Sequence, residues 1–360
     1  MGGNRTGERV RELFGIEEPI VLAPFGGLSA VELTAAVSEL GGLGSYGLYG
    51  YDADRIDATV RAIRSATSRP FALNLWLPTG DEVDPPRAQL HPATAVVAPF
   101  FRELGLDVPE PPARFLPDSA DQVDAVIAAR PAVLSVVFGV PSAQLIDRAH
   151  AAGIRVVGTA TTVDEAVALE AGGVDAVVAT GAEAAGHRVS FLRPAEESLV
   201  GGLSLIPQVV DAVKVPVIAA GGIADRRGVA AAFALGAEGV QVGTAFLRTR
   251  QSAANAAHRD AIARTPAHGT VLTRAMSGRL ARGVANRAVR TIEAAATDSA
   301  DAIAAFPAQN WLTGRFRAEA GRRGMGELQS LWMGQSAPLA TGTEAADVFR
   351  ELRAGVPGIR

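Results

Sequence analysis

Between Pro19 and Thr244 the sequence alternates short apolar runs with stretches of helical periodicity, and this alternation restricts the fold more than any other feature. The apolar runs have the length of strands buried on both faces, and strands that alternate with helices form a parallel sheet. Eight such units in about 230 residues are typical of an α/β fold of the (β/α)8 TIM barrel type, with a doubly wound open sheet as the alternative. The strands are expected at 19–24, 43–46, 71–76, 132–139, 154–160, 174–178, 216–222 and 239–244.

Helix start signals support the same alternation. Ser29 and Glu32 have the spacing of a capping box, and so do Thr162 and Glu165. In this motif the two side chains bond backbone N–H groups of the first turn, so we expect each pair to begin a helix. The second pair opens the helix expected at 163–171, and further helices are expected at 55–66, 91–104, 119–129, 142–152, 203–213 and 225–235.

Residues 77–118 interrupt the alternation after the third strand and hold nine of the 21 prolines. A long insertion after a strand is either a functional lid or a variable surface excursion, and the sequence alone supports both. Beyond residue 250 we expect a helical extension, with Trp311 and Trp332 as packing anchors. The predicted domains are therefore a barrel over 1–250 and a helical extension over 251–360 that packs on it.

Composition excludes several classes of function. Cysteine is absent, which excludes disulfides, iron–sulfur clusters, thiolate zinc sites and cysteine nucleophiles in this chain. The formal net charge of −4 gives no general attraction to nucleic acid. No apolar run is long enough to cross a bilayer and no leader-like apolar core opens the chain, so we expect a cytoplasmic protein with no membrane partner. The sequence leaves the oligomeric state open, a homo-oligomer included.

The tail carries a cluster of arginines that could form a basic surface. No aromatic residue lies among them and the chain is acidic, so we expect solvated or helix-pairing side chains and no nucleic-acid partner. The arginines are Arg274, Arg279, Arg282 and Arg287.

Two glycine turns follow the last two predicted strands. Gly221 and Gly222 follow the seventh strand, and Gly243 with Thr244 follows the eighth. In TIM barrels these two loops often bind a phosphate, because glycine lets clustered backbone N–H groups approach an anion. Asp225 is placed to cap the next helix, whose dipole would favour the same anion. The alternative is that the glycines only turn the chain, but their position after these two strands favours a phosphate site.

A third glycine pattern, GLGSYG at 42–47, matches the G-x-G-x-x-G of dinucleotide-binding folds. That fingerprint must follow a strand and open a helix. Here the glycines follow a predicted helix and open a predicted strand, so we expect no Rossmann site.

His187 ends the loop that leaves the sixth predicted strand, where barrel enzymes keep their catalytic residues. No second His or Asp stands at ligand spacing, so we expect no metal site. We interpret His187 as a general base, since imidazole titrates near neutral pH, with a hydrogen-bonding loop histidine as the alternative. Asn74, in the third strand, is either a partner for the edge of a planar heterocycle or a satisfied buried amide.

Together these segments resemble the nitronate monooxygenases, formerly called 2-nitropropane dioxygenases. The resemblance covers nearly the whole chain outside the insertion and runs through PIVLAPFGG, SELGGLG, FALNL, GAEAAGHR, VIAAGGI, GVQVGTAFL, SGRLARG and LWMGQSA. It implies an FMN-dependent TIM barrel with His187 as the catalytic base beside the isoalloxazine. It also implies that the cofactor is held by Ala23, Pro24, Phe25, Asn74, Gly221, Gly222, Gln241, Val242, Gly243 and Thr244.

Three positions depart from the family pattern. Ala185 precedes Gly186 where the family has a second glycine before the histidine, and Thr180 stands where a glutamine is usual. Phe25 replaces the methionine that usually ends the first strand. We still expect Thr180, Ala185 and Gly186 to lie at the cofactor, while the departures bear on substrate preference and catalytic competence.

The resemblance implies a small-molecule substrate: an alkyl nitronate, oxidised by O2 to a carbonyl compound and nitrite. His187 would remove the α-proton when the neutral nitroalkane is the substrate. Two other functions remain open. One is a flavin-dependent enoyl-thioester reductase that uses NAD(P)H and an acyl-carrier partner, and the other is a flavin-binding barrel with weak or no catalysis.

Overall fold

Eight parallel strands form the centre of the molecule in the computed structural model, which describes residues 7–85 and 89–358. They are β1 (Ile20–Leu22), β2 (Gly44–Gly47), β3 (Phe71–Trp76), β4 (Val133–Val137), β5 (Arg155–Ala160), β6 (Ala176–Thr180), β8 (Val217–Ala220) and β9 (Gly239–Val242). Their order around the sheet is β1-β9-β8-β6-β5-β4-β3-β2. The sheet closes because Val21 of β1 pairs in parallel with Leu43, just before β2. The predicted TIM barrel is confirmed.

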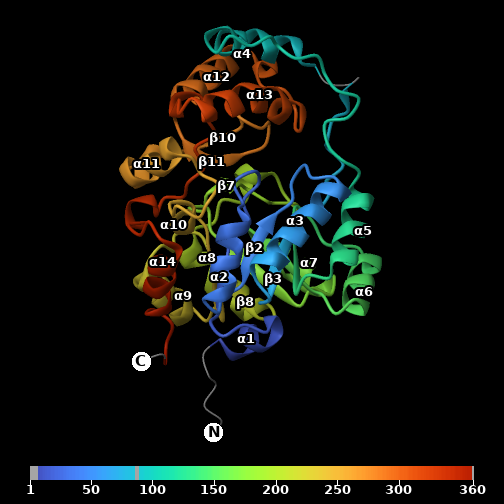
Figure 1. The fold of residues 1–360 in the computed structure, drawn as a ribbon, viewed down its shortest axis with the longest axis vertical. Coiled ribbons are helices and arrows are strands. Elements are labelled where there is room, and N and C mark those ends of the chain that lie inside the picture. The colour runs from blue at the N-terminus through green and yellow to red at the C-terminus, as the bar shows by residue number, and fades with distance from the viewer. Residues whose placement is uncertain (1–6, 86–88, 359–360) are drawn as a thin grey trace.

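The first helix lies across the amino end of the barrel (Figure 1). Val10 and Phe14 of α1 (Glu8–Phe14) pack against the interior residues of the strands, among them Val21 and Val178. Because this end is sealed, the open end is the one at which the strands finish and their loops begin. The helices that follow the strands are α2 (Val31–Glu39), α3 (Ala53–Ala66), α5 (Ser119–Ala129), α6 (Ala143–Ala151), α7 (Val163–Ala171), α8 (Gly202–Ala212), α9 (Arg226–Ala234) and α10 (Thr244–Leu247).

Of the two expected helix caps, the one at Thr162 is present, whereas the prediction for Ser29 is wrong. Thr162 caps α7, and its Oγ1 accepts a hydrogen bond from the N–H of Glu165 at 3.3 Å. Ser29 does not cap α2, which begins two residues later without a side-chain cap. Its Oγ instead accepts hydrogen bonds from the backbone N–H groups of Phe25 and Gly47, at 3.2 and 2.9 Å. The hydroxyl therefore joins the first two strand ends instead of starting a helix.

The insertion and the C-terminal segment share a second apolar core beyond the carboxyl ends of the strands (Figure 1). Phe316 lies against both Phe100 and Phe101 of the insertion helix, with ring centroids 5.4 and 5.8 Å apart. The last helix of the chain returns to the barrel and contacts α2 and α9. The division of domains at residue 250 stays a prediction. The helices of these segments are α4 (His91–Glu103), α11 (Ala256–Arg264), α12 (Arg287–Asp298), α13 (Ala308–Arg322) and α14 (Ala345–Arg353).

The expectation of a wholly helical tail is wrong at one place. β10 (Thr270–Thr273) and β11 (Ala281–Val284) form an antiparallel hairpin. β11 also pairs with β7 (Gly186–His187), a two-residue strand at the end of the loop after β6. Residues 273–289 hold four Arg and four Ala, which favour helices, but the pairing of β11 with β10 and with a distant barrel loop overrides this local preference.

The tail arginines all bond groups within the chain. Ion pairs and hydrogen bonds of 2.6 to 3.0 Å connect them to the barrel loops and to the insertion. They therefore serve as internal links. Their partners are Glu196 for Arg274, Glu82 for Arg279, the backbone oxygen of Ala182 for Arg282, and Glu103 for Arg287.

Within residues 7–85 and 89–358, no helix combines the length and the apolar character needed to cross a membrane. The expectation about a leader concerns the start of the sequence, of which residues 1–6 lie outside the described residues.

The glycines of GLGSYG serve close packing. They follow α2 and open β2, as expected. A Cβ added to Gly44 would lie 2.0 Å from the backbone oxygen of Thr34 in α2, and one added to Gly47 would lie 2.8 Å from that of Phe25. The helix can lie this close to the strand only because Gly44 has no side chain.

We expect Gly44→Ala to lower the free energy of unfolding by about 3 kcal/mol, because a methyl group there must push α2 away from β2. Gly201→Ala is the matched control, since nothing lies within 4 Å of an added Cβ and the backbone φ is −69°. Urea unfolding followed by circular dichroism measures both. Equal midpoints for the two variants would contradict the packing argument.

Candidate active site

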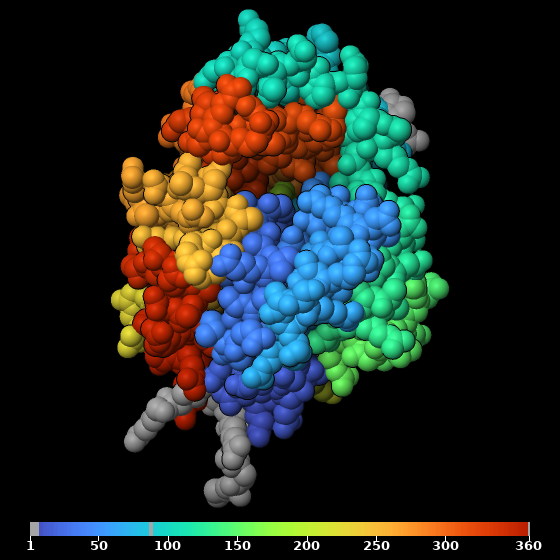
Figure 2. Space-filling model, viewed as in Figure 1, coloured from blue at the N-terminus to red at the C-terminus, as the bar shows by residue number. Residues whose placement is uncertain are grey.

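A cavity of about 640 Å³ opens at the carboxyl ends of the barrel strands, a size typical of small-molecule and cofactor sites. Strand ends and glycine turns form one wall, and α13 with residues 329–336 forms the other. Figure 2 shows the surface hollowed where the barrel meets the C-terminal helices. The structure brings together, around this cavity, Ala23, Pro24, Phe25, Asn74, Thr180, Ala185, Gly186, His187, Gly221, Gly222, Gln241, Gly243 and Thr244.

Val242 is the exception among the residues expected at the cofactor. Its side chain is buried in the apolar layer between the strands and the helices and does not line the cavity. Side chains alternate along a strand, so when Gln241 faces the cavity its neighbour must face the surrounding helices. Only the backbone of Val242 contributes near the site, and its oxygen accepts a hydrogen bond from the N–H of Ala23 at 2.9 Å.

The two glycine turns offer backbone N–H groups to a ligand. Gly221 and Gly222 have φ values of 92° and 74°, a region that glycine adopts without strain. In the described part of the chain, no hydrogen bond uses the N–H groups of these two glycines, of Gly243 or of Thr244. Asp225 caps α9 as expected, so the first N–H groups of that helix are already bonded to a carboxylate. The cradle for an anion is therefore formed by the turns themselves.

Asn74 keeps one polar atom available. Its Nδ2 donates to the backbone oxygen and to Oγ of Ser135, at 3.2 and 3.0 Å. No donor among the described residues bonds its Oδ1, and the residue lines the cavity. An acceptor of this kind suits an N–H at the edge of a planar heterocycle.

The loop that carries His187 is held from two sides. Arg188, 2% exposed, donates to backbone oxygens of the loop, with 2.7 Å between its Nη1 and the oxygen of Gly181. Arg282 of β11 donates to a third loop oxygen at 3.0 Å. The loop was expected to continue through His187, but its last two residues form β7, because Ala281 of β11 pairs with His187. The backbone of His187 is thereby fixed.

The imidazole of His187 is enclosed by aromatic rings and bonded at one nitrogen. Its Nε2 lies 2.8 Å from Oγ of Ser277, and its ring meets Trp76 edge-on with centroids 4.9 Å apart. Burial, together with the positive charges of Arg279 and Arg317, lowers the pKa of His187 to about 3. The ring does not titrate near neutral pH as a free imidazole does. It is neutral at physiological pH, and the neutral form is the one that accepts a proton.

Arg317 of α13, which sequence reasoning missed, adds a positive charge to the cavity wall. Its Nη2 donates to the backbone oxygen and Oδ1 of Asn310, at 3.0 and 2.7 Å, and its Nε has no hydrogen-bond partner among the described residues. Burial lowers the pKa of Arg317 to about 10, which leaves it charged at neutral pH. No Asp or Glu is among the described residues that line the cavity. The wall therefore favours anions.

Other residues of the wall were also missed. Trp332, expected only as a packing anchor, lines the cavity with its ring centroid 5.7 Å from that of His187. His258 lines it as well and bonds the backbone oxygen of Trp332 through Nε2 at 2.9 Å. The N–H of Gly334 donates to Oγ1 of Thr244 at 3.1 Å. The segment LWMGQSA contains two of these residues, but nothing in its pattern indicates that it folds back over the barrel.

Comparison with known proteins identifies the family. The sequence model of the nitronate monooxygenase family matches residues 7–354. A probable nitronate monooxygenase of Staphylococcus aureus is 41% identical over 345 residues, which are 96% of each chain. The chain belongs to the nitronate monooxygenase family. It is accordingly a flavin-dependent oxidoreductase.

Solved structures place the whole architecture within one fold. Nitroalkane oxidase from Streptomyces ansochromogenes matches with a TM-score of 0.85 at 34% identity, covering 97% of this chain and 98% of that one. FabK from Thermotoga maritima matches with a TM-score of 0.75 at 28% identity, covering 97% and 95%. At this coverage, the insertion and the C-terminal segment are largely part of the shared fold.

The depressed pKa of His187 predicts acid sensitivity. An unfolded histidine, with a pKa near 6.5, takes up a proton as the pH falls, whereas the native ring does not until about pH 3. Stability is therefore lost as the pH falls through this window, by about 2 kcal/mol between pH 7 and pH 5. Between pH 7 and pH 5, we expect the free energy of unfolding of His187→Gln to fall by about 2 kcal/mol less than that of the wild type. Urea unfolding at both pH values measures the two losses. His258 is present in both proteins and cancels, and equal losses would show that the native ring protonates normally.

Proposed function

We propose that the chain binds FMN in this cavity and uses O2 to oxidise alkyl nitronates to a carbonyl compound and nitrite. One observation carries the proposal. A single cavity contains unbonded N–H groups at two glycine turns, a neutral imidazole and a guanidinium, with no carboxylate among its described lining residues. Such a wall suits both the phosphate of a flavin nucleotide and an anionic substrate. The name of the structural relative, nitroalkane oxidase, supports the same chemistry.

The residues present fit FMN. The N–H groups of Gly221, Gly222, Gly243 and Thr244 would hold the phosphate, and Oδ1 of Asn74 would accept a hydrogen bond from the ring. When bound, the flavin would supply the redox chemistry that couples oxidation of the nitronate to reduction of O2. Ala23, Pro24, Phe25, Thr180, Ala185, Gly186 and Gln241 would form the surrounding wall.

The departure at Ala185 is compatible with this arrangement. Gly186 has a φ of 71°, a conformation that favours glycine, and the chain retains glycine there. Ala185 is not among the residues with positive φ, so its methyl group imposes no strain on the loop. The backbone that leads into His187 therefore tolerates the substitution.

His187 would act on neutral nitroalkanes. It would take the α-proton, and the electron pair of the C–H bond would form the C=N bond of the nitronate. The guanidinium groups of Arg279 and Arg317 disfavour the imidazolium that results. The nitronate anion formed beside it offsets this repulsion. A substrate supplied as the nitronate needs no base.

We expect His187→Ala to retain bound flavin and to lower kcat/KM for a neutral nitroalkane by roughly 10²–10⁴-fold, the contribution of a general base. Activity on a preformed nitronate should fall much less. Nitrite release in air measures both substrates. Unchanged activity of the variant on the neutral substrate would remove His187 from the mechanism.

Anaerobic mixing separates the proposed function from its alternatives. Purified protein should be yellow, release FMN on heating, and lose its flavin absorbance with a nitronate but not with NADH. Rapid bleaching by NADH without nitrite release would instead indicate an enoyl-thioester reductase. A yellow protein that releases no nitrite from any nitroalkane or nitronate would indicate a flavin-binding barrel without this activity.

A further inference from the structure

Ser277 is the hydrogen-bond partner of His187, although 90 residues separate the two in the chain. It lies in the turn between β10 and β11 and is 1% exposed. Its Oγ is 2.8 Å from Nε2 of His187. No residue of the described chain bonds the other ring nitrogen, Nδ1, and His187 lines the cavity.

The backbone around Ser277 decides where the hydroxyl proton points. Oγ donates to the backbone oxygen of Arg279 at 3.0 Å and accepts from the N–H of Arg279 at 3.3 Å. A carbonyl only accepts and an N–H only donates, so neither role can be exchanged. The hydroxyl has one proton and two lone pairs, which leaves one lone pair for His187. Nε2 must then carry the hydrogen.

The opposite tautomer would leave a polar group unsatisfied. If Ser277 donated to Nε2, the backbone oxygen of Arg279 would lose the only hydrogen bond that it accepts from the described residues. Arg279 is 7% exposed, so solvent does not readily replace that bond. The network therefore favours the Nε2–H form of the ring.

We infer that Ser277 is a positioning residue that holds His187 as the Nε2–H tautomer, so that Nδ1 is the atom that takes the α-proton. The assignment of Nδ1 as the acceptor rests on the proposed function of His187 as the base. Nδ1 of this tautomer carries a lone pair and gains the proton, while the C–H electron pair remains in the nitronate. Ser277 accepts from Nε2–H before and after the transfer, so no partner needs to move.

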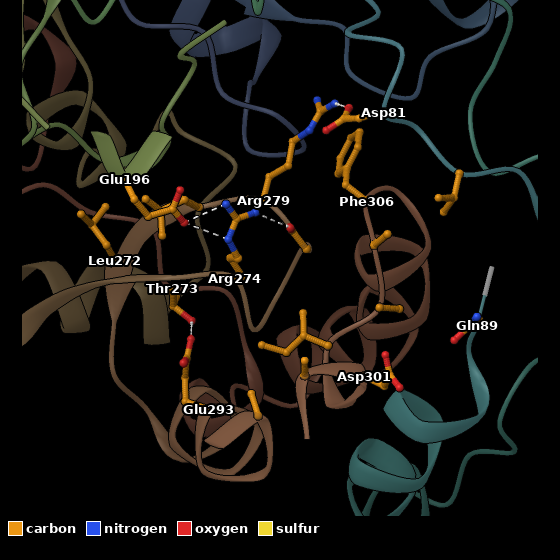
Figure 3. A pocket seen from close by; sticks show the side chains of 18 residues that line it. Asp81, Gln89, Glu196, Leu272, Thr273, Arg274, Arg279, Glu293, Asp301 and Phe306 are labelled. Atoms are coloured by element: carbon orange, nitrogen blue, oxygen red, sulfur yellow. Dashed lines mark hydrogen bonds and ion pairs between the residues drawn. The ribbon is translucent and has the colours of Figure 1, made fainter. Parts of the chain in front are cut away.

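The insertion after β3 holds the turn through Arg279. The guanidinium of Arg279 pairs with Asp81 and with Glu82, the latter at 2.9 Å, and lies 3.9 Å from the ring centroid of Phe306. Figure 3 shows Arg279 reaching Asp81 beside that ring. Its side chain is 9% exposed. The insertion thus fixes the residue whose backbone directs the proton of Ser277.

α13 holds the same turn from another side. Nε2 of Gln309 donates to the backbone oxygen of Ala275 at 2.7 Å, and Oγ1 of Thr313 donates to that of Met276 at 2.6 Å. Two consecutive carbonyls before Ser277 are therefore bonded to one helix. A hydroxyl fixed in this way is a supporting contact of the kind that keeps a reactive group in its working geometry.

Nitrogen NMR of the flavin-loaded protein, labelled with ¹⁵N at its five histidines, tests the tautomer directly. The signals of His187 are those that disappear in His187→Gln. At pH 7 we expect the wild type to show hydrogen on Nε2 and none on Nδ1. Ser277→Ala should show a mixture or the opposite form, and Ser277→Thr should restore the wild-type pattern. A wild-type ring with hydrogen on Nδ1 would overturn the inference whether or not the protein releases nitrite.

Kinetics supply the second readout. Ser277→Ala should lower kcat/KM for a neutral nitroalkane by roughly 10- to 100-fold, part of what a general base contributes, and should lower it much less for a preformed nitronate. Ser277→Thr should recover most of the loss. Ser198→Ala removes another buried hydroxyl, one that is not among the cavity-lining residues and bonds only the backbone oxygen of Pro194 among the described residues, and should match the wild type. Equal losses on both substrates in Ser277→Ala, with the circular dichroism unchanged, would overturn the positioning role.

Discussion

The antiparallel pairing of β7 with β11 is the contact on which the site depends. It places Ala281 opposite His187 and Arg282 opposite Gly186, and so joins a barrel loop to the C-terminal hairpin. Without it, His187 would lie in a loop with free backbone dihedrals, and Ser277 would have no fixed distance from the ring. This two-residue pairing therefore links the second core to the site, because it fixes the orientation of the His187 imidazole.

The cavity wall is positively charged because the nearby carboxylates bond backbone N–H groups of the loops and do not face the cavity. Both oxygens of Glu183 accept from the N–H of Gly202, at 2.9 and 3.0 Å, and Glu165 is fully buried among backbone donors, with 2.7 Å to the N–H of Phe191. Neither lines the cavity. Carboxylates at the barrel mouth thus stabilise loops, and the ligand side of those loops keeps unbonded N–H groups and the charge of Arg317. An anion therefore meets no negatively charged side chain among the described residues that line the cavity.

The barrel and much of its rim could be predicted from the sequence because their signals are local. Continuous apolar runs indicate buried parallel strands, and glycine at 221 and 222 indicates a backbone that other residues adopt with strain. The prediction at Ser29 was wrong because its spacing to Glu32 is also local, whereas the better partner of its hydroxyl, Gly47, comes from the neighbouring strand.

The opposite wall of the site could not be predicted, since its residues acquire their roles through contacts between distant segments. Ser277 needs the barrel loop, and Arg317 needs a cavity that only the folded chain defines. The hairpin of β10 and β11 was missed for the same reason. Its second strand, Ala281–Val284, contains helix-forming Ala and Arg and meets its two strand partners, β10 and β7, only in the folded chain.

The shared second core has a consequence for how the protein is made. Phe100 and Phe101 of α4 pack against α12 and α13, and five barrel strands separate the two groups along the chain. Synthesis proceeds from the amino end, so α4 leaves the ribosome before α12 and α13 exist. Its apolar face therefore stays exposed until the barrel has been translated. The late helices that finally shield this surface belong to the segment that delivers Ser277 and Arg317. In a nascent chain, the candidate active site is therefore completed at the same stage at which the apolar face of α4 becomes buried.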